Sequence, residues 1–159
     1  MASSKWQGSV ESKVMAPLEG VWKITSDYYE VKKWFPGMKS CERVEGAPEQ
    51  GVGSVRRCII SLPSDEESTE FFLREELLAQ DDSKHSFSYR MTDTDLPGFI
   101  GHEGTIEFCE LAKEEGNCLM KWSFQMNPIN AGRSKEDVEA LRRSILTGMV
   151  NNLEQLTSS

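Results

Sequence analysis

The chain has 159 residues, of which 38% are hydrophobic, enough for one domain with a sizeable core. Its formal charge of -8 and the lack of any extended basic cluster exclude a surface for phosphates, so we expect no nucleic-acid partner. The start MASSKW lacks the charged and apolar regions of a signal peptide, and no apolar run has membrane length, so we expect a cytoplasmic protein without membrane insertion.

The first part of the chain predicts one strand and two short helices. Residues 5–14 alternate as a half-buried strand does. Pro17 then begins a short helix that runs to Ile24. A second short helix, Tyr28–Trp34, ends because Pro36 and Gly37 break it.

Six further strand candidates follow, separated by turn-rich segments such as GAPEQGVG and TDTDLPG. Consecutive short strands joined by such turns indicate an antiparallel sheet. The candidates are Lys39–Glu45, Gly53–Ser61, Thr69–Ala79, His85–Met91, Phe99–Glu110 and Cys118–Met126.

The last segment, Ser134–Leu156, predicts one long amphipathic helix with Ser134 as its N-cap. Its apolar residues recur at three- and four-residue steps. They are Val138, Leu141, Ile145, Met149, Leu153 and Leu156. We therefore expect a single α+β domain over residues 1–159, in which a curved antiparallel sheet covers the C-terminal helix, because both apolar faces must be buried.

One strand candidate carries a charge on its apolar face. In Thr69–Ala79 the inward face holds Glu75 among Phe71, Leu73 and Leu77, whereas the opposite face would bury both Arg74 and Glu76. Burying Glu75 alone costs less. In Gly53–Ser61 the alternation leaves open whether Arg56 or Arg57 points inward.

The inner face of the other strands combines aromatic and aliphatic residues with a tyrosine and a histidine, Tyr89 and His102. Ile100 is expected inside as well. Because a buried charge is costly unless it is paired or solvated, a cavity that admits a small ligand accounts for this composition. A purely structural Glu–Arg ion pair is the alternative, and the aromatic residues are core by default.

Six blocks of the sequence carry a resemblance, and they occur in order along nearly the whole chain: KWQGSV, SCERVEG, VGSVRRC, FFLREELLAQD, SFSYRMT and KWSFQ. They resemble the lachrymatory factor synthase group of plant proteins. That group belongs to the polyketide cyclase/dehydrase and START-like superfamily, which has the birch-pollen-allergen fold. The resemblance implies a helix-grip fold, with seven antiparallel strands wrapped around the long helix and a hydrophobic cavity between them.

The resemblance also implies catalytic residues. The synthases use an arginine and a glutamate, whose motifs fall on Arg56 in VGSVR and on Glu75 in FFLREEL. A pocket tyrosine corresponds to Tyr89. A further active-site tyrosine falls on His102, and this departure implies a substrate other than the sulfenic acid of the synthases, because imidazole titrates near neutral pH whereas a phenol does not.

These observations predict an enzyme that isomerises, dehydrates or cyclises a small, largely apolar, reactive metabolite by proton transfer. Glu75 would donate or accept the proton, Arg56 would polarise an oxygen of the substrate, and Tyr89 and His102 would orient the substrate or relay the proton. A non-catalytic carrier or sensor of a hydrophobic ligand is the alternative. The predicted ligand-binding residues are Trp34, Phe71, Leu73, Phe87, Met91, Ile106, Trp122, Phe124, Leu141, Ile145 and Met149.

The cysteines and the motifs predict no metal and no organic cofactor. None of the cysteines forms a CxxC pair or has a histidine at metal-ligand spacing, so we expect reduced, buried or half-buried thiols. They are Cys41, Cys58, Cys109 and Cys118. The sequence leaves the oligomeric state open.

The abscisic acid receptors of the same superfamily are a second comparison. Ser61–Ser64 (SLPS) resembles their gate loop. Their hormone-binding lysine falls at about Glu30, and TDLPG replaces their His-Arg-Leu latch. Because Glu30 would repel a carboxylate, we expect no hormone sensing.

Overall fold

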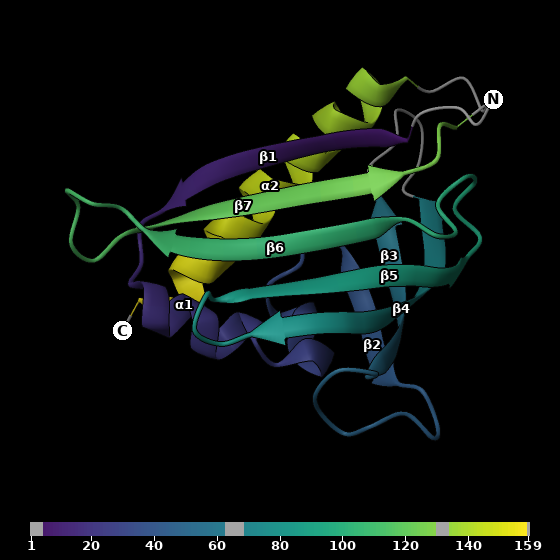
Figure 1. Cartoon of the computed structure of the whole chain (residues 1–159), viewed down its shortest axis with the longest axis horizontal. Coiled ribbons are helices and arrows are strands. Elements are labelled where there is room, and N and C mark those ends of the chain that lie inside the picture. Colours follow the sequence, from purple (N-terminus) through teal and green to yellow (C-terminus); the bar gives the residue numbers. More distant parts are fainter. Residues whose placement is uncertain (1–4, 63–68, 130–133, 159) are drawn as a thin grey trace.

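The structure is a computed structural model that describes residues 5–62, 69–129 and 134–158. Its elements follow the predicted order of one strand, two short helices, six strands and one long helix (Figure 1). The bounds are β1 (Trp6–Val14), α1 (Leu18–Thr25), the 3-10 helix η1 (Tyr28–Lys33), β2 (Met38–Arg43), β3 (Val55–Leu62), β4 (Thr69–Asp81), β5 (Ser86–Thr94), β6 (Glu103–Glu110), β7 (Cys118–Met126) and α2 (Lys135–Thr157).

The seven strands form one antiparallel sheet in the order β1-β7-β6-β5-β4-β3-β2. β1 and β2 are consecutive strands in the sequence, but they lie at opposite edges of the sheet. The helices α1 and η1 connect them at one end of the sheet (Figure 1). The predicted α+β class, with a curved antiparallel sheet and a C-terminal helix, is confirmed.

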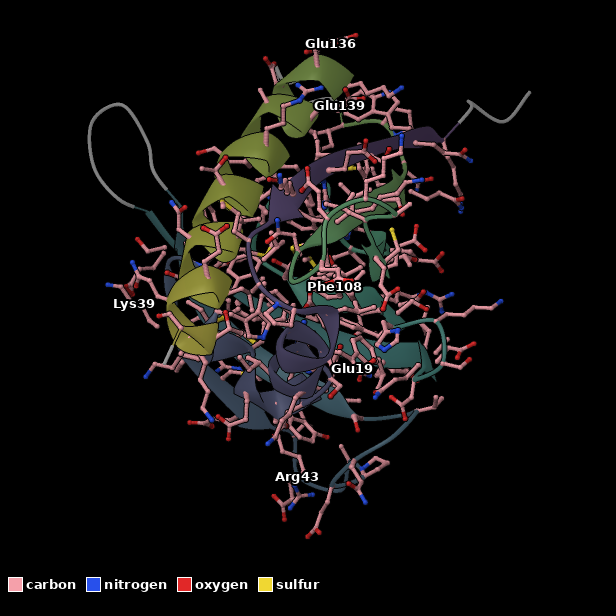
Figure 2. The ribbon with its side chains drawn as sticks, turned by 90° about the vertical axis from the view of Figure 1, so that its left-hand side faces the viewer. Glu19, Lys39, Arg43, Phe108, Glu136 and Glu139 are labelled. Carbon is pink, nitrogen blue, oxygen red and sulfur yellow. The ribbon has the colours of Figure 1, made fainter. Side chains whose placement is uncertain are left out.

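Helix α2 crosses one face of the sheet (Figure 1). Ser134 caps it as predicted: the Ser134 hydroxyl accepts a hydrogen bond from the Asp137 backbone N–H, and the Asp137 carboxylate accepts one from the Ser134 N–H. Figure 2 shows Glu136 and Glu139 at this first part of the helix; Glu136 is exposed, whereas the Glu139 side chain is only 22% exposed. In the described part of the chain, no helix is long and apolar enough to cross a membrane.

Side-chain alternation determines which residues enter the core. The inward sets of β5, β6 and β7 are fully buried and include Phe87, Ile106 and Trp122. On β4 Leu73, Glu75 and Leu77 are buried, as the alternation predicted, whereas Phe71 on the same face is only half-buried.

Three expectations about the core are wrong. The strand predicted at Phe99–Glu110 begins only at Glu103, because Gly98 and Gly101 adopt positive φ angles of 84° and 89° and form a turn, which leaves Ile100 61% exposed. On α2 the buried stripe contains Arg142 and Leu146, and the predicted Leu156 is 46% exposed. Cys109 is exposed, although Cys58 and Cys118 are buried and Cys41 is half-buried.

Candidate functional site

A cavity of about 70 Å³ lies between the sheet and α2. It is large enough for a few water molecules or a very small ligand. Most of its lining is apolar, and the polar lining residues are Glu75, Tyr89, His102 and Arg142. The apolar lining consists of Phe35, Ile60, Leu73, Met91, Leu96, Phe99, Trp122, Val138, Leu141 and Ile145.

Arg56 and Glu75 form a buried ion pair across neighbouring strands. They stand directly opposite each other on β3 and β4, and their exposed fractions are only 4% and 6%. Arg56 donates from Nε (3.1 Å) and Nη2 (2.9 Å), and both bonds end on Oε1 of Glu75. The register between the strands therefore decides what alternation left open: Arg56, not Arg57, points inward.

The remaining contacts of Arg56 hold its guanidinium in place. Its Nη1 donates to the backbone carbonyl of Tyr28 at 2.7 Å, and its Cζ lies 3.9 Å from the centre of the Tyr28 ring. Burial lowers the pKa of Arg56, but the neighbouring Tyr28 and Glu75 outweigh this effect and the net pKa is raised. Arg56 is therefore permanently charged.

Two register shifts bracket the segment of β4 that carries Glu75. The pairing between β4 and β5 slips between Arg74 and Glu75 and slips again between Leu77 and Ala79. Bulges of this kind re-aim side chains next to functional sites. Glu75 consequently stands opposite Met91, another lining residue of the cavity.

Tyr89 is fixed by its neighbours on β6 and β7. Its hydroxyl accepts a hydrogen bond from Trp122 Nε1 at 2.9 Å. Its ring covers Gly104 on the neighbouring strand, where an added Cβ would lie 2.5 Å from Tyr89 Cζ, so only glycine leaves room for the ring. Burial, and then the Glu75 charge, raise the pKa of Tyr89, so the phenol stays protonated at neutral pH.

His102 and Arg142 form the second polar contact of the cavity. Arg142 Nη2 donates a hydrogen bond to His102 Nε2. Because arginine has no acceptor, Nε2 must be the unprotonated nitrogen and the proton of the neutral ring lies on Nδ1. Burial, and then the Arg142 charge, hold the pKa of His102 well below its usual value of 6.5.

This lowered pKa predicts a loss of stability in mild acid. Below about pH 6.5 the unfolded chain binds a proton at residue 102 that the folded chain does not, so the free energy of unfolding falls as pH decreases, by up to about 1.4 kcal/mol per pH unit. Urea unfolding between pH 5 and 7 measures the slope. We expect a shallower slope for His102→Gln, whose amide oxygen still accepts from Arg142. His85→Gln is the control, since His85 lies outside the cavity lining, and equal slopes for wild type and His102→Gln would contradict the prediction.

The structure brings together part of the predicted site. Glu75, Tyr89 and His102 line the cavity, and Arg56 reaches it only through Glu75. Five of the predicted ligand-binding residues line it: Leu73, Met91, Trp122, Leu141 and Ile145. Six lie outside the lining: Trp34, Phe71, Phe87, Ile106, Phe124 and Met149.

Sequence reasoning missed six lining residues: Phe35, Ile60, Leu96, Phe99, Val138 and Arg142. The signal for Arg142 was its position four residues after Val138 and four before Leu146, on the buried stripe of α2. Leu96 and Phe99 belong to the turn after β5, where alternation carries no information. Among the described residues, no group of three or more histidine, cysteine or acidic side chains forms a metal site.

The structure also locates the residues that were compared with the hormone receptors. Glu30 is on η1 with its side chain 47% exposed, and it pairs with Lys33 at 3.4 Å. It does not line the cavity, so it does not contact a ligand bound there. Of the SLPS segment, Ser61 and Leu62 end β3, and Pro63 and Ser64 lie outside the described residues.

Three solved structures have the same fold over nearly the whole chain. They are ginseng major latex-like protein 151 from Panax ginseng (15% identity, TM-score 0.78, 99% of this chain and 100% of that one), XoxI from Bacillus cereus (21%, 0.72, 99% and 96%) and a START superfamily protein from Mycobacterium smegmatis (16%, 0.71, 95% and 96%). At such identities the likeness shows the fold alone. Residues 5–157 match the family model described as polyketide cyclase / dehydrase and lipid transport. The chain therefore belongs to this polyketide cyclase/dehydrase family.

Proposed function

We propose that the protein is a cofactor-independent enzyme of plant specialised metabolism, similar to the lachrymatory factor synthases. It acts on a small, mainly apolar, reactive metabolite by acid/base isomerisation, dehydration or cyclisation. The observation that carries the proposal is Glu75, a carboxylate in the lining of an otherwise mostly apolar cavity, with both hydrogen bonds from Arg56 on a single oxygen.

Because of the ion pair, the two carboxylate oxygens of Glu75 have different roles. Oε1 is held by Arg56, while Oε2 accepts no hydrogen bond from the described residues. Oε2 is therefore the oxygen that would take a proton from the substrate and return it at another carbon or to a leaving hydroxyl. Arg56 acts as a positioning residue, because its own donors are engaged by Glu75 and by Tyr28.

Tyr89 and Trp122 would orient the substrate. The Tyr89 hydroxyl already accepts from Trp122, so its own proton remains to be donated to an oxygen of a ligand. A ligand that fills this mainly apolar cavity would displace water from around these groups, which strengthens every electrostatic interaction inside. This arrangement suits a reactive intermediate that water would otherwise capture.

A hydrophobic-ligand carrier or sensor is the second candidate. The family description includes lipid transport, and a mainly apolar lining suits a bound hydrophobic molecule as well as a substrate. In this case Glu75 and Tyr89 would only satisfy polar atoms of the ligand. We propose the cytoplasm as the location of either activity, because all four cysteines are free.

The two candidates differ in the fate of the ligand. Native mass spectrometry after incubation with a plant metabolite extract identifies what the protein retains, and the retained compound is then incubated with fresh protein in D₂O. An enzyme that works by proton transfer converts the compound into an isomer, a cyclised product or a dehydrated product. Deuterium enters an isomer where Glu75 exchanges its proton with solvent before returning it, whereas a dehydration passes the abstracted proton to the departing water. Release of the unchanged, unlabelled compound would contradict catalysis and favour the carrier.

A further inference from the structure

Arg142 on α2 is a buried cation with most of its donors unused. Its exposed fraction is 5%. Beyond the bond from Nη2 to His102, its Nε and Nη1 have no hydrogen-bond partner among the described residues. Its Cζ lies 4.4 Å from the ring centres of both Trp122 and Phe124. Two aromatic faces offset only part of what it costs to remove a guanidinium from water.

The charges buried around the cavity do not balance. Among the described residues, the buried arginine, histidine and carboxylate side chains are Arg56, Glu75, His102 and Arg142. The buried tyrosines and cysteines stay neutral, because burial raises the pKa of the tyrosines and of Cys118, and a hydrogen bond with Cys41 together with burial raises that of Cys58. Arg56 and Glu75 neutralise each other, and burial keeps His102 neutral. One positive charge remains, and none of the described acidic side chains forms a salt bridge with Arg142. A buried charge of this kind requires a counter-charge or a solvated neighbour.

His102 holds one nitrogen of the Arg142 guanidinium and carries an unused donor on the opposite side of its ring. Because its Nε2 accepts from Arg142, its proton is on Nδ1, and Nδ1 is buried without a partner among the described residues. Because Nδ1 and Nε2 point to opposite sides of the imidazole ring, the Nδ1–H points away from Arg142. The unused N–H groups that can serve one ligand group are therefore those on Nε and Nη1 of Arg142, which lines the cavity. Donors of this number and charge match an anionic oxygen group.

From this geometry we infer that Arg142, with its guanidinium positioned by His102, binds a carboxylate or a comparable acidic oxygen group of the ligand, so that the ligand is a small apolar monoanion. The acidic group lies at Arg142, since the Glu75 carboxylate would repel it, and the apolar part packs among lining residues such as Leu141 and Ile145. As the assignment of a substrate class, this inference rests on the proposed function, but binding of the anion does not require catalysis.

The inference is tested by comparing two molecules of nearly equal shape. Butanoate and butanamide differ in charge, and NMR titration of the protein gives the dissociation constant of each. We expect wild type to bind butanoate about tenfold or more tightly than butanamide. The ratio should fall to about one in Arg142→Met and stay as in wild type in Arg143→Met, because Arg143 is the next residue on α2 and its side chain is 63% exposed.

The melting temperature of Arg142→Met without ligand provides an independent test. If the counter-charge of Arg142 comes from a bound anion, the ligand-free protein contains an uncompensated buried charge. Arg142→Met replaces this charge by an apolar side chain of similar length and should raise the melting temperature by about 2–4 °C. A structural cation predicts the reverse. Should Arg142→Met not fold, Arg142→Gln keeps a polar side chain without the charge and is expected to lose the same preference for butanoate.

Equal affinity of wild type for butanoate and butanamide, or a preference that survives in both Arg142 variants, would overturn the anion site. A failure of the proposed enzyme looks different. In that case the retained compound is released unchanged and unlabelled, while the preference for butanoate remains.

Discussion

Replacing Arg56 by methionine should lower the free energy of unfolding by about 3–5 kcal/mol. The substitution leaves Glu75 as an uncompensated carboxylate in the interior, because both of its hydrogen bonds from Arg56 are lost. The contact of the guanidinium with the Tyr28 ring and carbonyl disappears as well. Urea unfolding at pH 7, followed by circular dichroism, measures the change.

The chain contains a matched control for this prediction. Arg90 and Glu103 also stand directly opposite each other, on β5 and β6, and Arg90 donates from the same two atoms, Nε and Nη2, to Oε1 of Glu103. Their side chains are 49% and 35% exposed. We expect Arg90→Met to cost less than about 1 kcal/mol, since exposed pairs contribute little. Equal losses at the two sites would contradict the role assigned to burial.

A double substitution separates the effect of the buried charges on stability from the effect of side-chain volume. In Arg56→Met with Glu75→Leu both charges are gone, and an apolar pair of similar volume fills the space. Replacing a buried ion pair in this way is often neutral or stabilising. We therefore expect the double variant to recover most of the stability that Arg56→Met alone loses, which would show that the pair is retained for chemistry rather than for stability.

Glu75→Gln should lower kcat by about 10²–10⁴-fold on the substrate identified by the retention experiment, because an amide does not transfer the proton. Its shape is nearly that of the carboxylate, so binding should be kept and KM should change much less than kcat. Progress curves at several substrate concentrations separate the two constants. The assay temperature must lie below the unfolding transition of the variant, since Arg56 loses its counter-charge.

Glu103→Gln serves as the control for this loss of activity. Glu103 is also paired with an arginine, but it is partly exposed and lies outside the cavity lining. The kcat of Glu103→Gln should equal that of wild type. A Glu75→Gln protein with wild-type kcat would show that Glu75 is not the proton-transfer group. The carrier hypothesis would then depend only on whether the ligand is returned unchanged.

The sequence by itself determined the elements and much of the inner face. Alternation on a strand is a local property, because successive side chains point to opposite sides whatever the strand pairs with. For this reason Glu75, Tyr89 and Trp122 could be assigned to the interior before any pairing was known. The N-cap at Ser134 is local in the same sense, since Ser134 and Asp137 satisfy each other within one turn.

Only the tertiary structure decided which charges meet in the interior. Alternation on β3 allowed either Arg56 or Arg57 inside, and the register with β4 selected Arg56 by placing it opposite Glu75. Arg142 and Arg143 are adjacent in the sequence, and the crossing of α2 over the sheet sets Arg142 against Trp122 and Phe124. The cavity likewise depends on Leu96 and Phe99 from a turn without periodicity. These features arise from packing between segments far apart in the chain, and local patterns do not encode which segments will meet.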